Sequence, residues 1–196
     1  MVASHNAAKV REIRQVLAPL HVPVLSLDDV GLSDEIEETG GTFAENAAAK
    51  ALAVGRITGG PVLADDSGLV VDALDGRPGV MSARYGGEGL TDPERVELLL
   101  RQMADVPHGR RTARFVCVLA LAKGDRLLAT WAGCVAGLIA DEARGTGGFG
   151  YDPVFLYVPL GRTFAELTAE EKNALSHRGR AVRRLPWHLG ALHDPR

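Results

Sequence analysis

The sequence contains only two cysteines, Cys117 and Cys134, among its 196 residues. Both lie in apolar surroundings, and their spacing does not match that of a cysteine-based metal site. A predicted hairpin would bring the two thiols near each other, but a disulfide is not expected in a reducing compartment. We therefore expect buried, reduced thiols and a cytoplasmic protein.

Long apolar runs and a large charge excess are also missing. The longest apolar run, at residues 115–122, is too short to span a bilayer and is flanked by charges. No stretch resembles a signal peptide. The net charge is -3 and the sequence has no basic stripe, so we expect neither a nucleic-acid nor a membrane partner. Two common glycine-rich phosphate-binding patterns, Gly-x-x-x-x-Gly-Lys-Ser/Thr and Gly-x-Gly-x-x-Gly before a helix, are missing from the sequence as well.

What the sequence does contain is the balance of a globular protein, with 46% hydrophobic and 24% charged residues. The length suits one domain of ordinary size, or one domain with two lobes. Residues 1–196 contain no repeat and no convincing linker, and predicted strands and helices alternate along them. We therefore predict a single α/β domain with a mixed sheet.

Local patterns predict the individual elements. Strands are expected at residues 1–3, 22–27, 61–66, 69–71, 112–123, 126–139 and 154–157, and helices at residues 7–20, 46–57 and 91–103. Capping boxes at Thr42 and Thr168 mark two helix starts, and Ser176 is expected to cap a final helix.

The stretch at residues 64–72 carries the most unusual polar residues. An apolar run leads into Asp65 and Asp66, and Ser67 and Gly68 then predict a tight turn before a second strand. Carboxylates at the end of a buried strand are costly unless they are paired or bind a cation. Because neighbouring strand residues point to opposite faces, the two aspartates should do different jobs. The alternative is an Asx-type turn, in which both bond only nearby backbone amides.

Other segments add cations and flexible backbone. Lys9 lies in the first turn of a helix, where a cation opposes the helix dipole and could serve an anion; an exposed lysine is the alternative. Four glycines with Phe149 and Tyr151 form a loop that can approach a planar base closely, although both rings could be ordinary core residues. His177 and Arg178 begin a helix, where they could bind a ligand or simply be exposed.

Together these residues suit a nucleoside polyphosphate bound with Mg²⁺. Carboxylates are ligands that Mg²⁺ prefers, and the ion is often shared with substrate phosphates. Basic side chains and the amides at helix starts suit phosphate or carbonyl oxygens. The acidic segment at residues 34–41 is either a solvated loop or edge strand, or the source of a second carboxylate beside Asp66. The chemistry alone predicts a nucleotide-handling hydrolase.

In their order along the chain, six runs of the sequence resemble the inosine triphosphate pyrophosphatase family, also called XTP/dITP diphosphatases. These runs are residues 4–9 with Glu12, 38–47 with Lys50, 64–68, 77–85, 147–153 and 171–179. Each run is modestly specific by itself, whereas the ordered set is highly specific and covers nearly the whole chain.

The resemblance implies a two-lobed α/β fold around a long mixed sheet, with the active site in the cleft between the lobes. It implies a homodimer that hydrolyses ITP, dITP and XTP with Mg²⁺ to the monophosphate and pyrophosphate, which removes deaminated purines from the nucleotide pool. The sequence departs from the family at its start, where only three apolar residues precede Ser4 and His5 stands where a small residue is common.

The resemblance also assigns roles to residues. Asp66 is implied to bind the metal and accept a proton from water. Glu37 is implied to be the other metal ligand, with the adjacent Glu38 as an open alternative. Ser67 is implied to contact the substrate, and Asp65 is left as support for the turn. The remaining substrate contacts are implied for the phosphate-binding segment, the glycine-rich loop and the purine-reading residues: Ser4, His5, Asn6, Ala7, Ala8, Lys9, Phe149, Gly150, Tyr151, Asp152, Lys172, His177 and Arg178.

Two alternatives stay open. A Maf-like pyrophosphatase would prefer modified pyrimidine nucleotides or dTTP, and the likeness of residues 176–178 to a purine-reading segment argues against it. A nucleotide-binding module without turnover would have no need of Asp66, Lys9 and Glu37 together.

Overall fold

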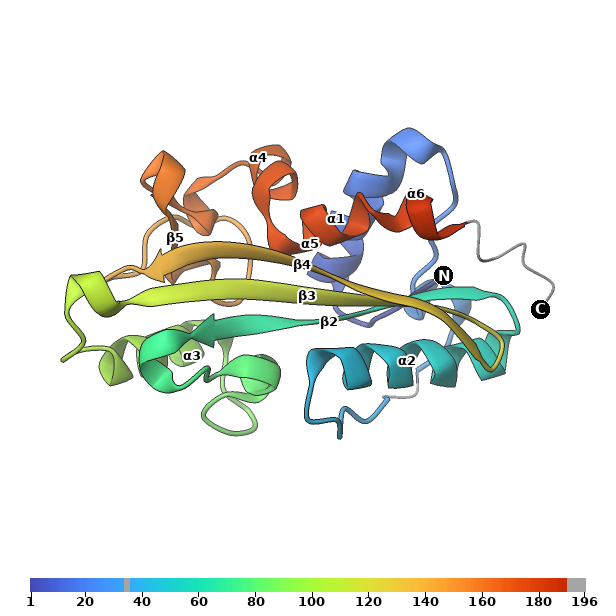
Figure 1. Ribbon diagram of the computed structural model, residues 1–196, viewed down its shortest axis with the longest axis horizontal. Coiled ribbons are helices and arrows are strands. Elements are labelled where there is room, and N and C mark those ends of the chain that lie inside the picture. The colour runs from blue at the N-terminus through green and yellow to red at the C-terminus, as the bar shows by residue number, and fades with distance from the viewer. Residues whose placement is uncertain (34–35, 190–196) are drawn as a thin grey trace. The chain divides into compact units, whose positions relative to one another are not determined.

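The computed structural model (Figure 1) describes residues 1–33 and 36–189. Its strands form a six-stranded sheet in the order β1-β2-β3-β4-β5-β6. The bounds are β1 (Val2–Ala3), β2 (Pro61–Val71), β3 (Thr112–Lys123), β4 (Arg126–Ile139), β5 (Phe155–Tyr157) and β6 (Arg162–Thr163). β1 is parallel to β2, whereas β5 is antiparallel to β4 and β6. The helices are α1 (Ala7–Leu17), α2 (Phe43–Thr58), α3 (Asp92–Gln102), α4 (Ala169–Leu175), α5 (His177–Val182) and α6 (Leu185–His188).

The chain divides into two compact units, and β2, β3 and β4 each contribute residues to both. Unit 1 comprises residues 1–67, 117–133 and 177 onward, and unit 2 comprises residues 68–116 and 134–176. The predicted α/β class with a mixed sheet and flanking helices is confirmed. A single domain over the whole chain, and an active site between two lobes, stay predictions.

Unit 1 has α1, α5 and α6 on one face of its strands and α2 on the other (Figure 1). Its buried apolar cluster joins Val10, Ile13 and Leu17 of α1 to strand residues such as Leu63 and Leu119. The apolar spacing of α1 therefore marked the buried face correctly. Close packing at α5 depends on a glycine, because a Cβ at Gly133 would lie 2.2 Å from the carbonyl oxygen of His177.

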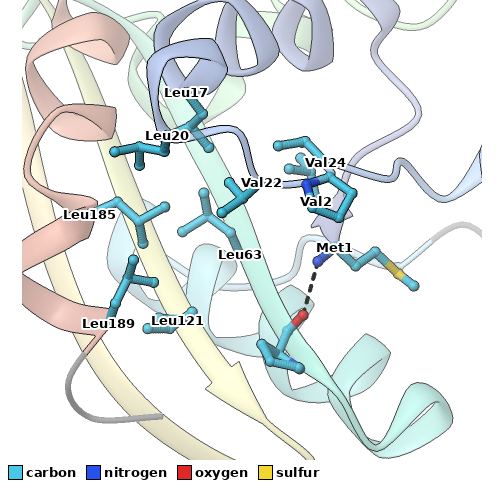
Figure 2. Close-up of a pocket in the computed structure, with 12 residues that line it drawn as sticks. Met1, Val2, Leu17, Leu20, Val22, Val24, Leu63, Leu121, Leu185 and Leu189 are labelled. Atoms are coloured by element: carbon cyan, nitrogen blue, oxygen red, sulfur yellow. Dashed lines mark hydrogen bonds between the residues drawn. The ribbon is translucent and has the colours of Figure 1, made fainter.

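An apolar pocket of about 340 Å³ lies beside the start of β1 in unit 1 (Figure 2). Val22 and Val24 line it from an irregular segment, so the strand predicted at residues 22–27 is wrong. The Val2 N–H donates to the Leu25 carbonyl at 2.7 Å, but Pro23 has no N–H to extend a ladder. The apolar side chains of Val22, Pro23 and Val24 instead line the pocket.

Unit 2 is built around a second apolar cluster, in which α3 buries Val96 and Leu99. Phe115, Phe155 and Phe164 pack ring against ring within it, with centroids 4.6 to 5.9 Å apart. Such tilted and stacked ring contacts are typical of aromatic cores. The cluster gives unit 2 a rigid body to which its loops are attached.

Several local predictions hold. The capping box at Thr42 is formed reciprocally with Glu45, and the one at Thr168 is also present. β3 and β4 have the predicted bounds and are joined by a two-residue turn at residues 124–125. Ser176 lies directly before α5, and its capping of that helix stays a prediction; the final helix breaks before α6, which has Pro186 in its first turn. Within the described residues, no helix combines the length and hydropathy needed to cross a bilayer.

Two further predictions are wrong. β2 is one continuous strand through Asp65, Asp66, Ser67 and Gly68, so no turn divides it. The strand continues because the apolar residues on both sides of Ser67 and Gly68 are buried in an extended conformation, and burial overrides turn propensity. The expectation of two buried thiols is wrong, because Cys134 is exposed whereas Cys117 is buried. Neither of these described residues is in a disulfide.

Helix α2 and the turn between β3 and β4 approach each other closely within unit 1. Gly55 of α2 faces the hairpin turn, and a Cβ there would lie 2.3 Å from the Gly124 carbonyl oxygen. Gly→Ala in a helix ordinarily stabilises by about 1 kcal/mol, but Gly55→Ala should instead destabilise by about 1–3 kcal/mol through overpacking. Urea unfolding measures the change, with Ala49→Gly on the exposed face of α2 as the control for helix propensity alone. A higher urea midpoint for Gly55→Ala would contradict the close packing.

Candidate active site

The start of α1 is built by its cap. The Asn6 side chain accepts hydrogen bonds from the amides of Ala8 and Lys9, at 3.0 and 3.1 Å, and Ser4 Oγ accepts one from the amide of Asn6 at 3.1 Å. His5 Nδ1 lies 2.7 Å from Asp28 Oδ1. The loop before α1 is thus held in one conformation, with the predicted phosphate-binding segment at the helix start.

Alternation along β2 sends Asp65 and Asp66 to different partners, as predicted. Asp65 is 1% exposed and Asp66 is 4% exposed, so both carboxylates need compensation. Asp65 is bonded by cations and a thiol, whereas Asp66 is bonded by an amide side chain and lies near one lysine. The proposed role of Asp65 as support for a turn is wrong, because the strand has no turn there.

Asp65 lies at the centre of a buried charge cluster. Its Oδ1 accepts from Lys9 Nζ at 2.6 Å and from Ser67 Oγ at 3.0 Å. Its Oδ2 accepts from Arg178 Nε and from Cys117 Sγ, each at 3.0 Å. Burial alone would raise the pKa of Asp65, but Arg178 and Lys9 hold it well below the ordinary value of 3.8. Burial and the adjacent carboxylate raise the pKa of the Cys117 thiol, so the thiol stays protonated and acts as a donor.

Arg178 is buried rather than exposed at the start of α5. Its Nη1 donates to Glu12 Oε2 at 2.5 Å and its Nη2 to Ser67 Oγ at 2.7 Å. Although burial opposes its charge, Asp65 and Glu12 raise the pKa of Arg178. The guanidinium therefore stays charged and fixes α1, β2 and α5 around one point of unit 1.

Asp66 belongs to a second group, which sequence reasoning found only in part. Asn46 Nδ2 donates to Asp66 Oδ2 at 3.0 Å, and the Ser67 amide donates to Oδ1 at 3.0 Å. Lys50 Nζ lies 3.7 Å from Asp66 Oδ1 and donates to Glu38 Oε1 at 2.5 Å and to the Asp65 carbonyl at 2.7 Å. The signal for Asn46 and Lys50 was their spacing of four residues, which places both on one face of α2.

The pKa of Asp66 is raised, which contrasts with that of Asp65. Burial is the main cause; Lys50 lowers the pKa and Glu38 raises it. A carboxylate with too little positive charge around it gains stability from an added cation. Among the described residues no three His, Cys, Asp or Glu side chains gather as a complete metal site. A divalent cation can be held by one or two carboxylates together with substrate phosphates, so Asp66 with a neighbouring glutamate fits such a metal.

The two candidate glutamates differ. Glu37 is exposed, whereas Glu38 is half-buried and ion-paired with Lys50. Residues 34 and 35, also in the predicted acidic segment, lie outside the described part of the chain. The structure thus brings Glu38 to the Lys50–Asp66 group and leaves Glu37 one residue away.

The glycine-rich loop belongs to unit 2. Asp152 Oδ2 accepts from the Phe149 amide at 2.8 Å and forms an ion pair with Lys172. Lys172 Nζ lies 4.6 Å from the centre of the Phe149 ring, which is a cation–π distance. Tyr151 is a core residue, 5% exposed, and its hydroxyl donates to the Ser82 carbonyl at 3.0 Å. Phe149, Asp152 and Lys172 therefore form one group, and Tyr151 anchors the loop.

Comparisons with known proteins establish the family of the chain. A model of the Ham1 family matches residues 1–187. The chain belongs to the Ham1 family. It is 52% identical over 190 residues to a dITP/XTP pyrophosphatase of Geobacter sulfurreducens, covering 97% of this chain and 96% of that protein. It is 47% identical to the Bacillus subtilis protein of the same name, with 97% and 96% covered.

Solved structures of Ham1 proteins have the same fold. A HAM1 protein from Coxiella burnetii superposes with a TM-score of 0.86 at 42% identity, covering 96% of each chain. The Staphylococcus aureus Ham1 protein gives a TM-score of 0.85 at 38% identity, covering 97% of each. The family resemblance read from six sequence runs is confirmed.

The Asp65 cluster predicts how stability depends on charge and pH. Asp65→Asn leaves the buried Arg178 and the half-buried Lys9 without their carboxylate and should lower the free energy of unfolding by about 3–5 kcal/mol at pH 7. Because the pKa of Asp65 is lowered on folding, the wild-type advantage is complete above 3.8 and declines as the pH falls below it. Urea unfolding of both proteins at pH 7 and pH 3 measures this.

The matched control is Asp28→Asn, which removes an exposed carboxylate paired with His5. It should change the free energy of unfolding by less than about 1 kcal/mol. An Asp65→Asn protein as stable as Asp28→Asn, or an advantage that stays constant down to pH 3, would contradict the ion-pair account.

Proposed function

We propose that this chain hydrolyses the non-standard purine nucleoside triphosphates ITP, dITP and XTP to the monophosphate and pyrophosphate. The observation that carries the proposal is the buried Asp66, whose pKa is raised and which lies beside Lys50. The family membership supports it, because the relatives described above are dITP/XTP pyrophosphatases. By this proposal the chain clears deaminated purines from the nucleotide pool.

Asp66 is proposed to accept the proton of the attacking water. Asn46 and the Ser67 amide fix the orientation of its carboxylate, and a base must be held in this way to act on a single water. A divalent cation, Mg²⁺ by this proposal, would be held by Asp66 and Glu37 and would offset charge on the phosphates. Lys9 and Lys50 add positive charge in the same unit, and the amides at the start of α1 suit phosphate oxygens. Cleavage of the α–β anhydride then releases pyrophosphate.

The remaining predicted contacts are assigned to the substrate in the same proposal. Ser67 and residues 4–9 serve the triphosphate, while Phe149, Asp152 and Lys172 serve the base, together with His177 and Arg178. A donor that meets the 6-oxo group of hypoxanthine or xanthine would face another donor in adenine. Each buried donor left without an acceptor costs about 1–3 kcal/mol, so a few such contacts exclude ATP.

The proposal also covers the oligomeric state, the cellular location and the partners of the enzyme. We expect a homodimer in the cytoplasm, with no nucleic-acid partner at a net charge of -3. Size-exclusion chromatography with light scattering measures the oligomeric state directly.

A nucleotide panel tests the activity. Pyrophosphate release from ITP, dITP, XTP, ATP and dTTP is measured with Mg²⁺ and with EDTA. We expect kcat/KM for ITP and XTP to exceed that for ATP at least about 30-fold, and Asp66→Asn to reduce release by about 10²–10⁴. A preference for dTTP would support the Maf-like alternative, and tight binding without turnover would support a binding module.

Neighbouring variants test the metal ligand. Because Glu38 Oε1 is already bonded to Lys50, we assign Glu38 to positioning that lysine and the exposed Glu37 to the cation. Glu37→Gln should therefore raise the Mg²⁺ concentration for half-maximal activity about 10- to 100-fold. Glu38→Gln, the matched control, should shift that concentration less than Glu37→Gln does, because its carboxylate is bonded to Lys50. The reverse pattern would assign the metal to Glu38.

A further inference from the structure

The glycine-rich loop of unit 2 is tied to helix α3 by one side chain. The amide of Gly150 donates to Asp92 Oδ2 at 2.8 Å. Other amides of the loop are bonded elsewhere: Gly147 donates to the Ala165 carbonyl at 2.9 Å, and Phe149 donates within the loop to Asp152 Oδ2 at 2.8 Å. Asp92 therefore connects the backbone next to Phe149 to a helix more than 50 residues earlier in the chain.

Packing alone does not hold this loop in place. A pocket of about 490 Å³ lies between the loop and α3, lined by residues 145–150 on one side and by residues such as Val96 and Leu100 on the other. Gly148 and Gly150 have φ of +71° and +59°, in a region where glycine has large conformational freedom. Because a hollow lies between this glycine-rich loop and α3, the position of the loop relative to α3 depends on hydrogen bonds.

Asp92 is itself well placed to act as a fixed anchor. It is the first residue of α3, where a negative charge is favoured by the helix dipole. Its Oδ1 accepts from Arg95 Nη1 at 3.2 Å, which leaves Oδ2 directed to Gly150. α3 is fixed in turn by Val96 and Leu99 in the core of unit 2. A site attached to a rigid element is more accurately positioned than one on a loop alone.

We propose that Asp92 is a positioning residue that sets the glycine-rich loop for binding of the purine base. This inference rests on the proposed function, because the loop is assigned there to the base. Asp92 acts through the Gly150 amide on the adjacent Phe149 and does not take part in the phosphate chemistry of Asp66. Its loss should therefore weaken binding of base-containing ligands and spare ligands that are phosphate alone.

The experiment compares Asp92→Ala with wild type in steady-state turnover of ITP. KM should rise about tenfold, the equivalent of one hydrogen bond to a charged group. kcat should change by less than about twofold, because the lost interaction stabilises the bound substrate and the transition state equally. The inhibition constant of inorganic tripolyphosphate, which has no base, should stay unchanged. Asp92→Asn keeps an oxygen acceptor and should give a KM between those of the other two proteins.

The matched control is Glu97→Ala on the same helix. Glu97 lines the same pocket and also carries a negative charge, but its carboxylate lies 3.8 Å from Arg101 rather than at the loop. Its KM should match that of wild type. Equal rises in KM for Asp92→Ala and Glu97→Ala, or parallel losses of ITP and tripolyphosphate binding, would overturn the inference in favour of a general effect on α3.

Hydrogen exchange separates this inference from the proposed function. Exchange of the peptide containing residues 147–153 should be faster in Asp92→Ala than in wild type and unchanged in Glu97→Ala. If the wild type shows no preference for ITP, the proposed function fails while faster exchange still establishes the Asp92 anchor. If the wild type prefers ITP and Asp92→Ala shows neither a higher KM nor faster exchange, the anchor fails by itself.

Discussion

Unit 1 depends on the ion pair between Asp65 and Arg178. Both side chains are almost completely buried, and charges in such surroundings are tolerated only when each finds a partner. Lys9 and Glu12 of α1 complete the cluster, so the net charge of these four groups is zero. A helix near the start of the chain, a central strand and a helix near the end are held together by this single point.

The extended backbone of β2 gives adjacent aspartates opposite electrostatic surroundings. Asp65 meets two cations and has a lowered pKa, whereas Asp66 meets mainly burial and has a raised one. Asp65 therefore stabilises the unit, whereas Asp66 has too little positive charge around it to offset its burial. The latter property is what a metal-binding carboxylate or a general base requires, and it follows directly from the two-residue period of a strand.

In unit 2 the main physical constraint is the shape of the glycine-rich loop. This loop must keep a defined shape although glycine favours many backbone conformations. The loop meets this need with polar anchors, since Asp152, Asp92 and the Ser82 carbonyl each hold one of its residues. Steric limits add to them, because a Cβ at Gly148 would lie 2.0 Å from Asp152 Oδ2. A flexible sequence thereby becomes a fixed surface.

The sequence by itself determined the elements whose signals are local. Capping residues, apolar spacing and the two-residue turn at residues 124–125 placed α2, α3, β3 and β4, because these signals act between neighbours in the chain. Six ordered motifs were enough to indicate the family and with it the candidate residues. The strand period also predicted that Asp65 and Asp66 would differ.

Tertiary structure alone decided which partners those residues have. The turn expected at Ser67 and Gly68 does not form, because burial of the flanking residues keeps β2 extended. Arg178, a proposed substrate contact, is also bonded to Asp65 and to Glu12, a residue 166 positions away in the chain. Such pairs leave no periodic trace in one sequence, since they depend on how distant segments pack. For the same reason, the contacts of Lys50 and Asp92 are visible only in the folded chain.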